Sequence, residues 1–251
     1  MKPDSNGQLH RTADVYRNIM LYWDNADPFP QGIIEIAEEW RRVCSEWNIM
    51  LFGKESAQHF LRDNFGKDIS RLFLSCALPT MRSDFFRVFW AFSEGGIYSD
   101  MRFIPLCEPL FFEPRKNLTL PIHSIGRISN GIFYSKKESI ELKSIQYEII
   151  KSLREQKHQS VFGATGPGAW MRALVPGPDR KLQLQRIMSQ GQMGEIEIVT
   201  WETLRKKFLL LSKYPGPERF THMHWTLQQR RMSIYHHRSS FGSRIFSKLR
   251  R

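Results

Sequence analysis

Cysteine is scarce in this chain of 251 residues, and its apolar runs are short. The three cysteines, Cys44, Cys76 and Cys107, stand far apart without CxxC spacing, which argues against a zinc ribbon or a disulfide framework. No apolar stretch is long enough to span a bilayer, and the polar N-terminus lacks the apolar segment of a signal peptide. We therefore expect a protein of the reducing cytoplasm, soluble or peripheral on the cytoplasmic membrane.

The composition is that of a packed globular domain. Hydrophobic residues make up 41% of the chain and aromatic residues 13%, spread along the sequence without a repeat. That content is enough to bury a substantial core. We interpret residues 1–241 as a single α/β domain and residues 242–251 as a basic C-terminal tail.

The formal net charge is +12, which favours anionic partners such as phosphorylated substrates, acidic lipid headgroups or nucleic acid. The tail interleaves cations with Phe246 and Leu249, so it either docks on an anionic membrane surface or extends as a solvated segment. No zinc-finger, RRM-like or helix-turn-helix signature accompanies the charge. Nucleic acid is therefore the least favoured partner.

The first fifty residues show the pattern of a parallel α/β unit. Residues 17–24 form an apolar run that ends in Asp24, which predicts a buried strand. Apolar residues then recur at helical spacing between Ile33 and Trp47, and residues 48–52 are again short and apolar. Strand, amphipathic helix and strand in this order indicate a crossover connection in a mostly parallel sheet.

Two helices are expected next, one from Ser56 and, after a short piece around residues 69–77, one from near Thr80. The last is apolar nearly all round, so its polar members Arg82, Asp84 and Arg87 must find partners or line a site. Gly95 and Gly96 are predicted to end this helix. Residues 97–99 then read as a central strand with Asp100 at its carboxyl end, where open α/β sheets place ligand-binding residues.

The rest of the chain is predicted to continue the sheet. Strands are expected near residues 118–122, 131–134 and 195–200, and a helix over residues 138–154. A Gly-rich turn over residues 163–168 either presents backbone N–H groups to an anion or is an ordinary helix start, with Thr165 near the cap and Pro167 in the first turn. The Gly-Lys-Ser/Thr ending of a Walker A loop is absent.

One stretch carries a specific motif, with eight polar, glycine and aromatic positions in fixed order: Arg82, Ser83, Asp84, Arg87, Gly95, Gly96, Tyr98 and Asp100. This pattern resembles the glycosyltransferase family defined by a sugar-binding region with a DXD motif, which includes yeast-type α-1,6-mannosyltransferases and bacterial capsular-polysaccharide enzymes. The resemblance implies a GT-A-like, Rossmann-like fold, a mostly parallel mixed sheet flanked by helices, and a nucleotide-sugar donor.

Weaker fragments extend the resemblance from Arg17 to Phe241. The strand ending in Trp23, the stretch that begins at Ser129 and Asn130, the turn at Thr165-Gly166-Pro167 and the closing His236-His237 each look like a family feature in the family's order. Phe241 stands where the family has Trp. The donor-binding residues that the resemblance implies are Trp23, Arg82, Arg87, Gly95, Gly96, Tyr98, Asn130, Arg102, Thr165, Gly166 and His237.

Asp100 and Asp84 are the expected catalytic residues. A nucleotide-sugar donor needs carboxylates for ribose and sugar hydroxyls and a positive group for the diphosphate. Asp100 fits the first task, Asp84 is expected to accept hydrogen bonds from the donor sugar, and Arg87 to orient it or contact phosphate. A buried structural ion pair is the alternative for these charges. Trp23 either stacks on the base or packs in the core.

Arg102 departs from the family because it replaces the second Asp of the DXD motif, the residue that the resemblance implies binds manganese. Either Arg102 neutralises the diphosphate itself, or Mn²⁺ or Mg²⁺ is held weakly by Asp100 and His237, or the site only binds. For His222, His224 and His236, surface or core packing is favoured over metal binding.

The sequence therefore predicts a hexosyltransferase that moves a sugar from a UDP- or GDP-linked donor to a glycan, polysaccharide or lipid-linked acceptor. The resemblance implies retention of the anomeric configuration, and no nucleophile for a double displacement is evident. A non-catalytic sugar-nucleotide-binding protein is the alternative, followed by a basic nucleic-acid-binding protein.

Overall fold

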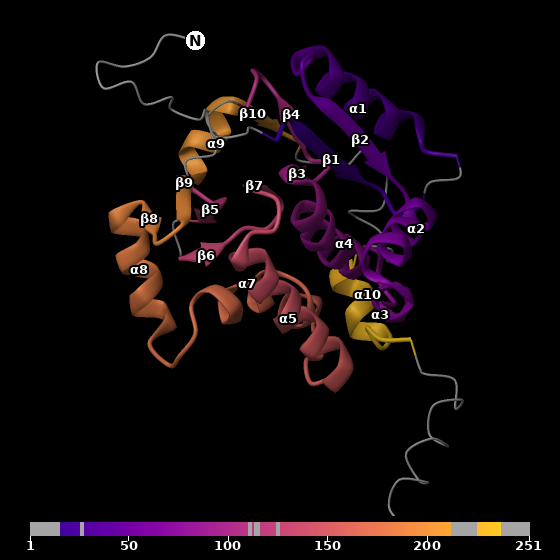
Figure 1. Cartoon of the computed structure of the whole chain (residues 1–251), viewed down its shortest axis with the longest axis vertical. Coiled ribbons are helices and arrows are strands. Elements are labelled where there is room, and N and C mark those ends of the chain that lie inside the picture. The colour runs from indigo at the N-terminus through magenta and orange to yellow at the C-terminus, as the bar shows by residue number, and fades with distance from the viewer. Residues whose placement is uncertain are drawn as a thin grey trace, which may run out of the picture.

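The computed structural model describes residues 16–25, 28–109, 112, 116–123, 126–211 and 225–236. Within this part of the chain, eight strands form one sheet in the order β2-β1-β3-β7-β5-β9-β8, with β6 paired to β5 (Figure 1). The strands of this sheet are β1 (Asn18–Tyr22), β2 (Asn48–Phe52), β3 (Gly96–Ser99), β5 (Leu118–His123), β6 (Arg127–Ile128), β7 (Ile132–Ser135), β8 (Gln192–Met193) and β9 (Ile196–Thr200).

The sheet is mixed but mostly parallel. β2, β1 and β3 are parallel neighbours, and β5 is parallel to β9. β7 runs antiparallel to both β3 and β5, so β3 and β5 point the same way. The mostly parallel mixed sheet that the sequence predicts is confirmed, and the strands predicted over residues 17–24, 48–52, 97–99 and 195–200 are present.

Helices cover both faces of this sheet (Figure 1). One face packs against α1 (Gln31–Val43), α9 (Trp201–Lys207) and a small antiparallel pair, β4 (Phe103–Pro105) with β10 (Phe208–Leu210). The other packs against α2 (Lys54–Phe65), α3 (Lys67–Ser75), α4 (Pro79–Glu94), α5 (Ile140–Glu155) and α7 (Pro167–Leu174). The remaining helices are α6 (Val161–Ala164), α8 (Arg180–Gln190) and α10 (Trp225–Arg231).

Alternation along β1 explains the two cores. Ile19 and Leu21 belong to the cluster under α1, whereas Met20 and Tyr22 belong to the cluster under α4. Successive strand residues point to opposite faces, so a wholly apolar strand is stable only when both faces are covered. The apolar run before Asp24 therefore leads to the three-layer arrangement.

Helix α4 delivers the chain to the centre of the sheet. Pro79 occupies its first turn, and the helix stops at Gly95, which has φ 65°. At Gly96 φ is 108°, and an added Cβ would stand 2.3 Å from the carbonyl oxygen of Asn18 in β1. The turn from α4 into β3 thus requires glycine for both backbone conformation and close approach, which confirms the predicted helix end.

The antiparallel strand β7 brings a second segment to the end of β3. Ser99 pairs with Ile132, so Asp100 follows β3 where Gly131 precedes β7. The Asp100 N–H donates a hydrogen bond to the Gly131 carbonyl at 2.7 Å. Asp100 therefore lies at the carboxyl end of β3, as predicted, and residues 130–131 lie beside it.

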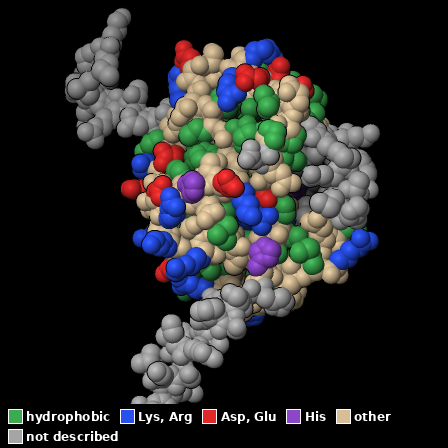
Figure 2. All heavy atoms as spheres, turned by 90° about the vertical axis from the view of Figure 1, so that its right-hand side faces the viewer, with side chains coloured by type: hydrophobic (Ala, Val, Ile, Leu, Met, Phe, Trp, Pro, Cys, Tyr) green, Lys and Arg blue, Asp and Glu red, His purple; other side chains and the backbone are tan. Residues whose placement is uncertain are grey.

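Figure 2 shows the face of the molecule on the right-hand side of Figure 1, where Lys and Arg side chains are interspersed with Asp and Glu. Exposed ion pairs on α1 and α3 include Arg41–Glu38 and Arg71–Asp68. Exposed pairs of this kind add little stability. Among the described residues, no helix has the length and apolar character needed to cross a membrane.

Candidate functional site

Asp100 is the partly exposed member of a cluster of charged side chains at the carboxyl edge of the sheet. Its side chain is 20% exposed. The Tyr98 hydroxyl donates a hydrogen bond to Oδ1 at 2.5 Å, and Nη2 of Arg87 lies 3.3 Å from the same oxygen. Within the described residues, none donates a hydrogen bond to Oδ2, so this oxygen is available to a ligand.

Arg87 is the buried centre of the cluster, with its side chain 3% exposed. Its guanidinium reaches Asp84 at 3.1 Å and donates to the carbonyl oxygen of Asn130 and to the side chain of Ser83. It also lies over the Tyr98 ring, 4.2 Å from the centroid. The buried charge is thus paired with two carboxylates and surrounded by acceptors, the condition under which burial of an arginine is tolerated.

Asp84 lies behind Asp100 and is almost fully buried. Asn130 donates to its Oδ1 at 3.0 Å, and the Thr165 hydroxyl donates to Oδ2 at 3.3 Å. Both of its oxygens therefore accept hydrogen bonds from protein groups, and the direct contact with a donor sugar that we expect from the sequence stays a prediction. Burial raises the pKa of Asp84 from 3.8 to about 6, against the opposing influence of Arg87.

Arg82 forms a second buried ion pair, with Asp24 at the end of β1. Nε and Nη2 of Arg82 donate to the two oxygens of Asp24 at 2.7 Å each, a bidentate geometry. Its Nη1 donates to the carbonyl oxygen of Cys76, and the Tyr22 hydroxyl donates to Asp24. Arg82 is predicted to bind donor, but here all of these contacts tie α4 to the edge of the sheet.

Gly131 provides space beside the free oxygen of Asp100. An added Cβ at this position would stand 2.7 Å from Oδ2 of Asp100 and 3.5 Å from Nη2 of Arg102. Both side chains therefore point at the same small region. Arg102 Nε is buried without a hydrogen-bond partner in the described part of the chain.

The other predicted site residues divide into two groups. Thr165 and Gly166 lie against Asp84, at the junction where α6 ends and α7 begins, so the predicted helix start is present. Trp23 is half-buried at the end of β1 and packs against the core under α1. Gly95 and Gly96 lie at the amino end of β3, the end opposite Asp100, and the structure does not bring them to the cluster.

His237 lies outside the described residues, as do His222, His224, Phe241 and the tail at 242–251. Among the residues that are described, no group of three or more His, Cys, Asp and Glu side chains is arranged to hold a metal ion. His236 follows Tyr235, and its N–H donates to the Ser75 carbonyl oxygen.

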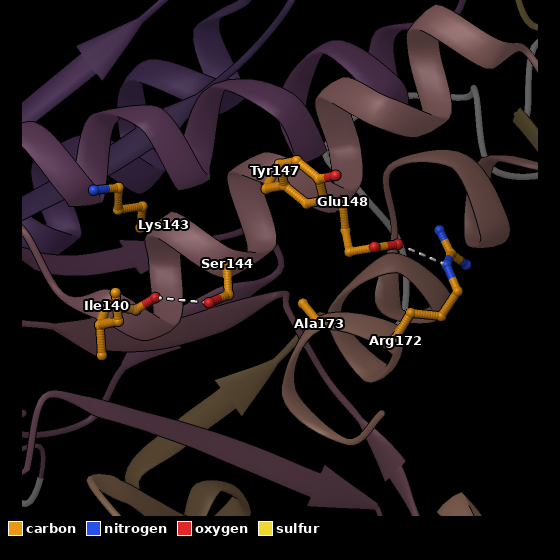
Figure 3. Close-up of a pocket in the computed structure, with 7 residues that line it drawn as sticks. All are labelled: Ile140, Lys143, Ser144, Tyr147, Glu148, Arg172 and Ala173. Atoms are coloured by element: carbon orange, nitrogen blue, oxygen red, sulfur yellow. Dashed lines mark hydrogen bonds and ion pairs between the residues drawn. The ribbon is translucent and has the colours of Figure 1, made fainter. Parts of the chain in front are cut away.

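A surface hollow of about 350 Å³ lies elsewhere, between α5 and α7 (Figure 3). It is lined by exposed Ile140 and Tyr147 and by the Glu148–Arg172 ion pair. Arg172 also donates to Ser152 and to the Gly163 carbonyl oxygen, so it fastens α7 to α5 and α6. None of the predicted site residues lines this hollow.

Two residues that sequence reasoning missed are Asp24 and Gly131. Asp24 ends the predicted strand as Asp100 does, and that position was the available signal. Gly131 follows Asn130 as the first residue of a predicted strand, but only the pairing of β7 with β3 reveals which side chain it faces. Both depend on contacts between segments far apart in the sequence.

Fold and site together define an α/β protein with a carboxylate–guanidinium cluster at the carboxyl edge of its sheet, the position at which such folds bind nucleotides. Residues 30–119 match the model of a protein family described as the glycosyltransferase sugar-binding region containing the DXD motif. This matched region includes Asp84, Arg87 and Asp100. The resemblance predicted from the sequence is confirmed.

Two known proteins are similar to the chain over longer ranges. The initiation-specific alpha-1,6-mannosyltransferase of Schizosaccharomyces pombe (strain 972 / ATCC 24843) is 29% identical over 194 residues, which cover 65% of this chain and 48% of that protein. The chain thus spans about half the length of this curated relative. The solved structure of the PaToxG glycosyltransferase superposes with a TM-score of 0.47 and 12% identity, covering 88% of each chain.

Proposed function

We propose that this protein is a glycosyltransferase that moves a hexose from a nucleotide sugar, UDP- or GDP-linked, to a glycan, polysaccharide or lipid-linked acceptor. The observation that carries the proposal is the state of Asp100. One of its oxygens is fixed by Tyr98 and Arg87, and the other is open to a ligand next to Gly131. A carboxylate oriented in this way is suited to accept hydrogen bonds from donor hydroxyls.

Asp84 acts in this proposal as a positioning residue. It neutralises Arg87 and holds Asn130 and Thr165, and Arg87 in turn lies 3.3 Å from Asp100. Asp84 therefore acts on the donor through Arg87 and Asn130. This differs from the direct contact expected from the sequence, because both Asp84 oxygens already accept hydrogen bonds from the protein.

Arg102 supplies the positive charge for the donor diphosphate. A metal ion held at Asp100 would lie in the same region as the Arg102 guanidinium, whose Nη2 is also directed at Gly131. A divalent cation and the Arg102 guanidinium would repel each other at such close range, so the described residues do not fit a divalent cation. A guanidinium pairs with phosphate oxygens in bidentate fashion and is always charged, which suits it to the role.

The reaction in this proposal retains the anomeric configuration. The bond between the anomeric carbon and the diphosphate oxygen breaks as the acceptor hydroxyl oxygen bonds to the same face of that carbon. The acceptor proton passes to the departing diphosphate oxygen. Arg102 stabilises the charge that develops on this oxygen.

The test is donor hydrolysis without acceptor. The chain is incubated with a panel of UDP- and GDP-hexoses, and released nucleotide diphosphate is measured. Asp100→Asn keeps the shape but loses the charge-assisted hydrogen bonds, so turnover should fall by about 100-fold or more. Asp68→Asn, a matched carboxylate-to-amide change at an exposed position of α3, should leave turnover unchanged.

Two results separate the proposal from its alternative. Wild-type turnover in Asp100→Asn would refute the site assignment. Thermal stabilisation by a nucleotide sugar without turnover in the wild type would instead support a sugar-nucleotide-binding protein.

A further inference from the structure

A second group of side chains lies at the same edge of the sheet, on the side of Asp100 away from β1 and β2. His123 ends β5, and it pairs across the β5–β6 hairpin with Arg127. Trp201 begins α9 directly after β9, and Arg205 follows one turn later on the same helix. Arg102 joins this group to the Asp100 cluster, because it follows Asp100 by two residues.

Aromatic rings form the floor of this group. The His123 ring lies 4.1 Å from the Trp201 ring, centroid to centroid, at an interplanar angle of 32°. The Arg102 guanidinium carbon lies 5.7 Å from the Trp201 centroid and 5.0 Å from that of Phe103. The side chains of His123, Trp201 and Arg102 are all only partly buried, so the group is accessible from solvent.

The three arginines of the group, Arg102, Arg127 and Arg205, form no ion pair within the described residues. No carboxylate there lies within 4.0 Å of Arg102, Arg127 or Arg205, whereas Arg82 and Arg87 are both paired. The pKa of His123 is lowered first by burial and then by these same three arginines, with no acidic group opposing them. Cations gathered in this way repel one another, and a bound anion relieves that repulsion.

We propose that His123, Arg127 and Arg205, arranged around Trp201 beside Arg102, bind a phosphate group carried by the acceptor. The inference rests on the proposed glycosyl transfer and adds the chemical class of the acceptor. Each of the two exposed guanidiniums offers several N–H donors in a planar fork. A phosphate group has more oxygens to accept these hydrogen bonds than a single carboxylate has. The imidazole of His123 donates one further N–H.

Position assigns this group to the acceptor. In the sheet order, β3 and β7 carry Asp100 and Gly131, β1 and β2 lie on one side of them, and β5 and β9 lie on the other. The donor diphosphate is already assigned to Arg102. An acceptor whose phosphate sits between β6 and α9 therefore approaches Asp100 from the side that the donor leaves open.

The experiment compares two acceptors that differ only in one phosphate group, a methyl hexoside and its phosphate monoester. The wild type should use the phosphorylated acceptor with at least about 10-fold higher kcat/KM at low salt, and the preference should decrease as salt screens the charges. The double change Arg127→Gln with Arg205→Gln should remove the preference. Donor hydrolysis should stay unchanged, because neither residue belongs to the donor site.

The matched control is Lys143→Gln with Arg186→Gln, which removes two exposed cations elsewhere and should keep the preference. Equal kcat/KM for both acceptors in the wild type, or a preference that persists in the Arg127/Arg205 variant, would overturn the inference.

Calorimetric titration of the phosphorylated hexoside without donor tests the site independently of turnover. Binding that weakens about 10-fold or more in the Arg127/Arg205 variant, and not in the control, supports the site even if no nucleotide sugar is hydrolysed and the proposed function fails. Inorganic phosphate that binds as tightly as the phosphorylated hexoside would show a free-phosphate site and contradict the acceptor assignment.

Discussion

At the scale of single residues, the site depends on small side chains as much as on charged ones. Asp100 keeps its free oxygen because Gly131 has no Cβ, and Arg102 reaches the same region for the same reason. Asn130, next to Gly131, donates to Asp84 with its side chain and accepts from Arg87 with its carbonyl. The two residues before β7 therefore lie against both carboxylates, Asn130 against Asp84 and Gly131 against Asp100.

Gly131→Ala should inactivate the site without unfolding the protein. The added Cβ would stand 2.7 Å from Oδ2 of Asp100, so that carboxylate must move. Gly131 does not have a positive φ, and alanine is compatible with its backbone. A displacement of this size should lower donor hydrolysis by about 100-fold. The melting temperature, measured in parallel, should change little, and unchanged hydrolysis would place the donor elsewhere.

The pKa of Asp84 predicts a pH dependence. Burial raises this pKa from 3.8 to about 6, so the carboxyl loses its proton only as the pH rises through about 6. The ionised form accepts the hydrogen bonds from Asn130 and Thr165 and pairs with Arg87. Donor hydrolysis should therefore rise with pH through about 6. The rise should be absent from Asp84→Asn, and a variant that keeps it would assign the step to another group.

Ionisation of Asp84 as the pH rises should lower the stability of the fold, although it should increase donor hydrolysis. A folded pKa above the unfolded value means that the folded state binds the proton more tightly. The contribution of Asp84 to the free energy of unfolding is therefore largest below pH 4 and decreases as the pH rises through about 6. Urea titrations of the wild type and Asp84→Asn across this range measure the contribution directly.

At the scale of elements, the succession of strands and helices up to β3 could be predicted from the sequence, whereas short elements such as β4 and β10 and the order of strands in the sheet could not. The periodicity of α1 and the glycines after α4 are local signals. The position of β7 between β3 and β5 is set by packing across the sheet. Asp100 was predicted because it follows a strand, whereas its contact with Gly131 depends on that pairing.

For α4, the sequence pattern predicts that the buried charges need partners, but it does not identify those partners. Its apolar composition correctly required partners for Arg82, Asp84 and Arg87. Which partners they find could not be deduced, because Asp24 and Asn130 lie 58 and 46 residues away in the sequence. The Arg87–Asp84 pair is local to the helix, whereas the Arg82–Asp24 ion pair and the Asn130–Asp84 hydrogen bond are long-range contacts that only the assembled sheet provides.

The turn from α4 into β3 predicts a large loss of stability for Gly96→Ala. The residue has φ 108°, and the new Cβ would stand 2.3 Å from the backbone oxygen of Asn18, which cannot move without shifting β1. The left-handed conformation alone costs about 1–2 kcal/mol, and the clash adds to it. Gly66→Ala is the matched control, because Gly66 has φ 85° with nothing within 4 Å.

Denaturant unfolding of the two variants separates the backbone cost from the clash. Gly66→Ala should lose about 1–2 kcal/mol, and Gly96→Ala should lose clearly more. Equal losses would show that β1 and β3 yield to the methyl group, and that close approach is not what fixes this glycine.

At the scale of the whole molecule, the excess of positive charge bears on how the diphosphate of the proposed donor would be neutralised. The net charge is +12, and one cation, Arg102, stands at the position where the related motif has its second Asp. The described residues hold no cluster of three metal-ligating side chains. If side chains alone neutralise the diphosphate, a nucleotide diphosphate should bind and stabilise the folded protein without a metal ion.

Thermal unfolding of the whole chain with nucleotide diphosphate measures this. At a ligand concentration of 100 Kd the folded state gains about 2.7 kcal/mol, which raises the melting temperature by about 5–10 °C in a chain of this size. The wild type should show the same rise in EDTA as in manganese. Arg102→Asp places a carboxylate where the guanidinium was, so its rise should be lost in EDTA and return only with manganese. Arg102→Gln, which removes the charge without adding a ligand, should lose the rise under both conditions.

If chelation abolishes the rise in the wild type and manganese restores it, a metal ion and not Arg102 neutralises the diphosphate, and the guanidinium is left to the acceptor side of the site.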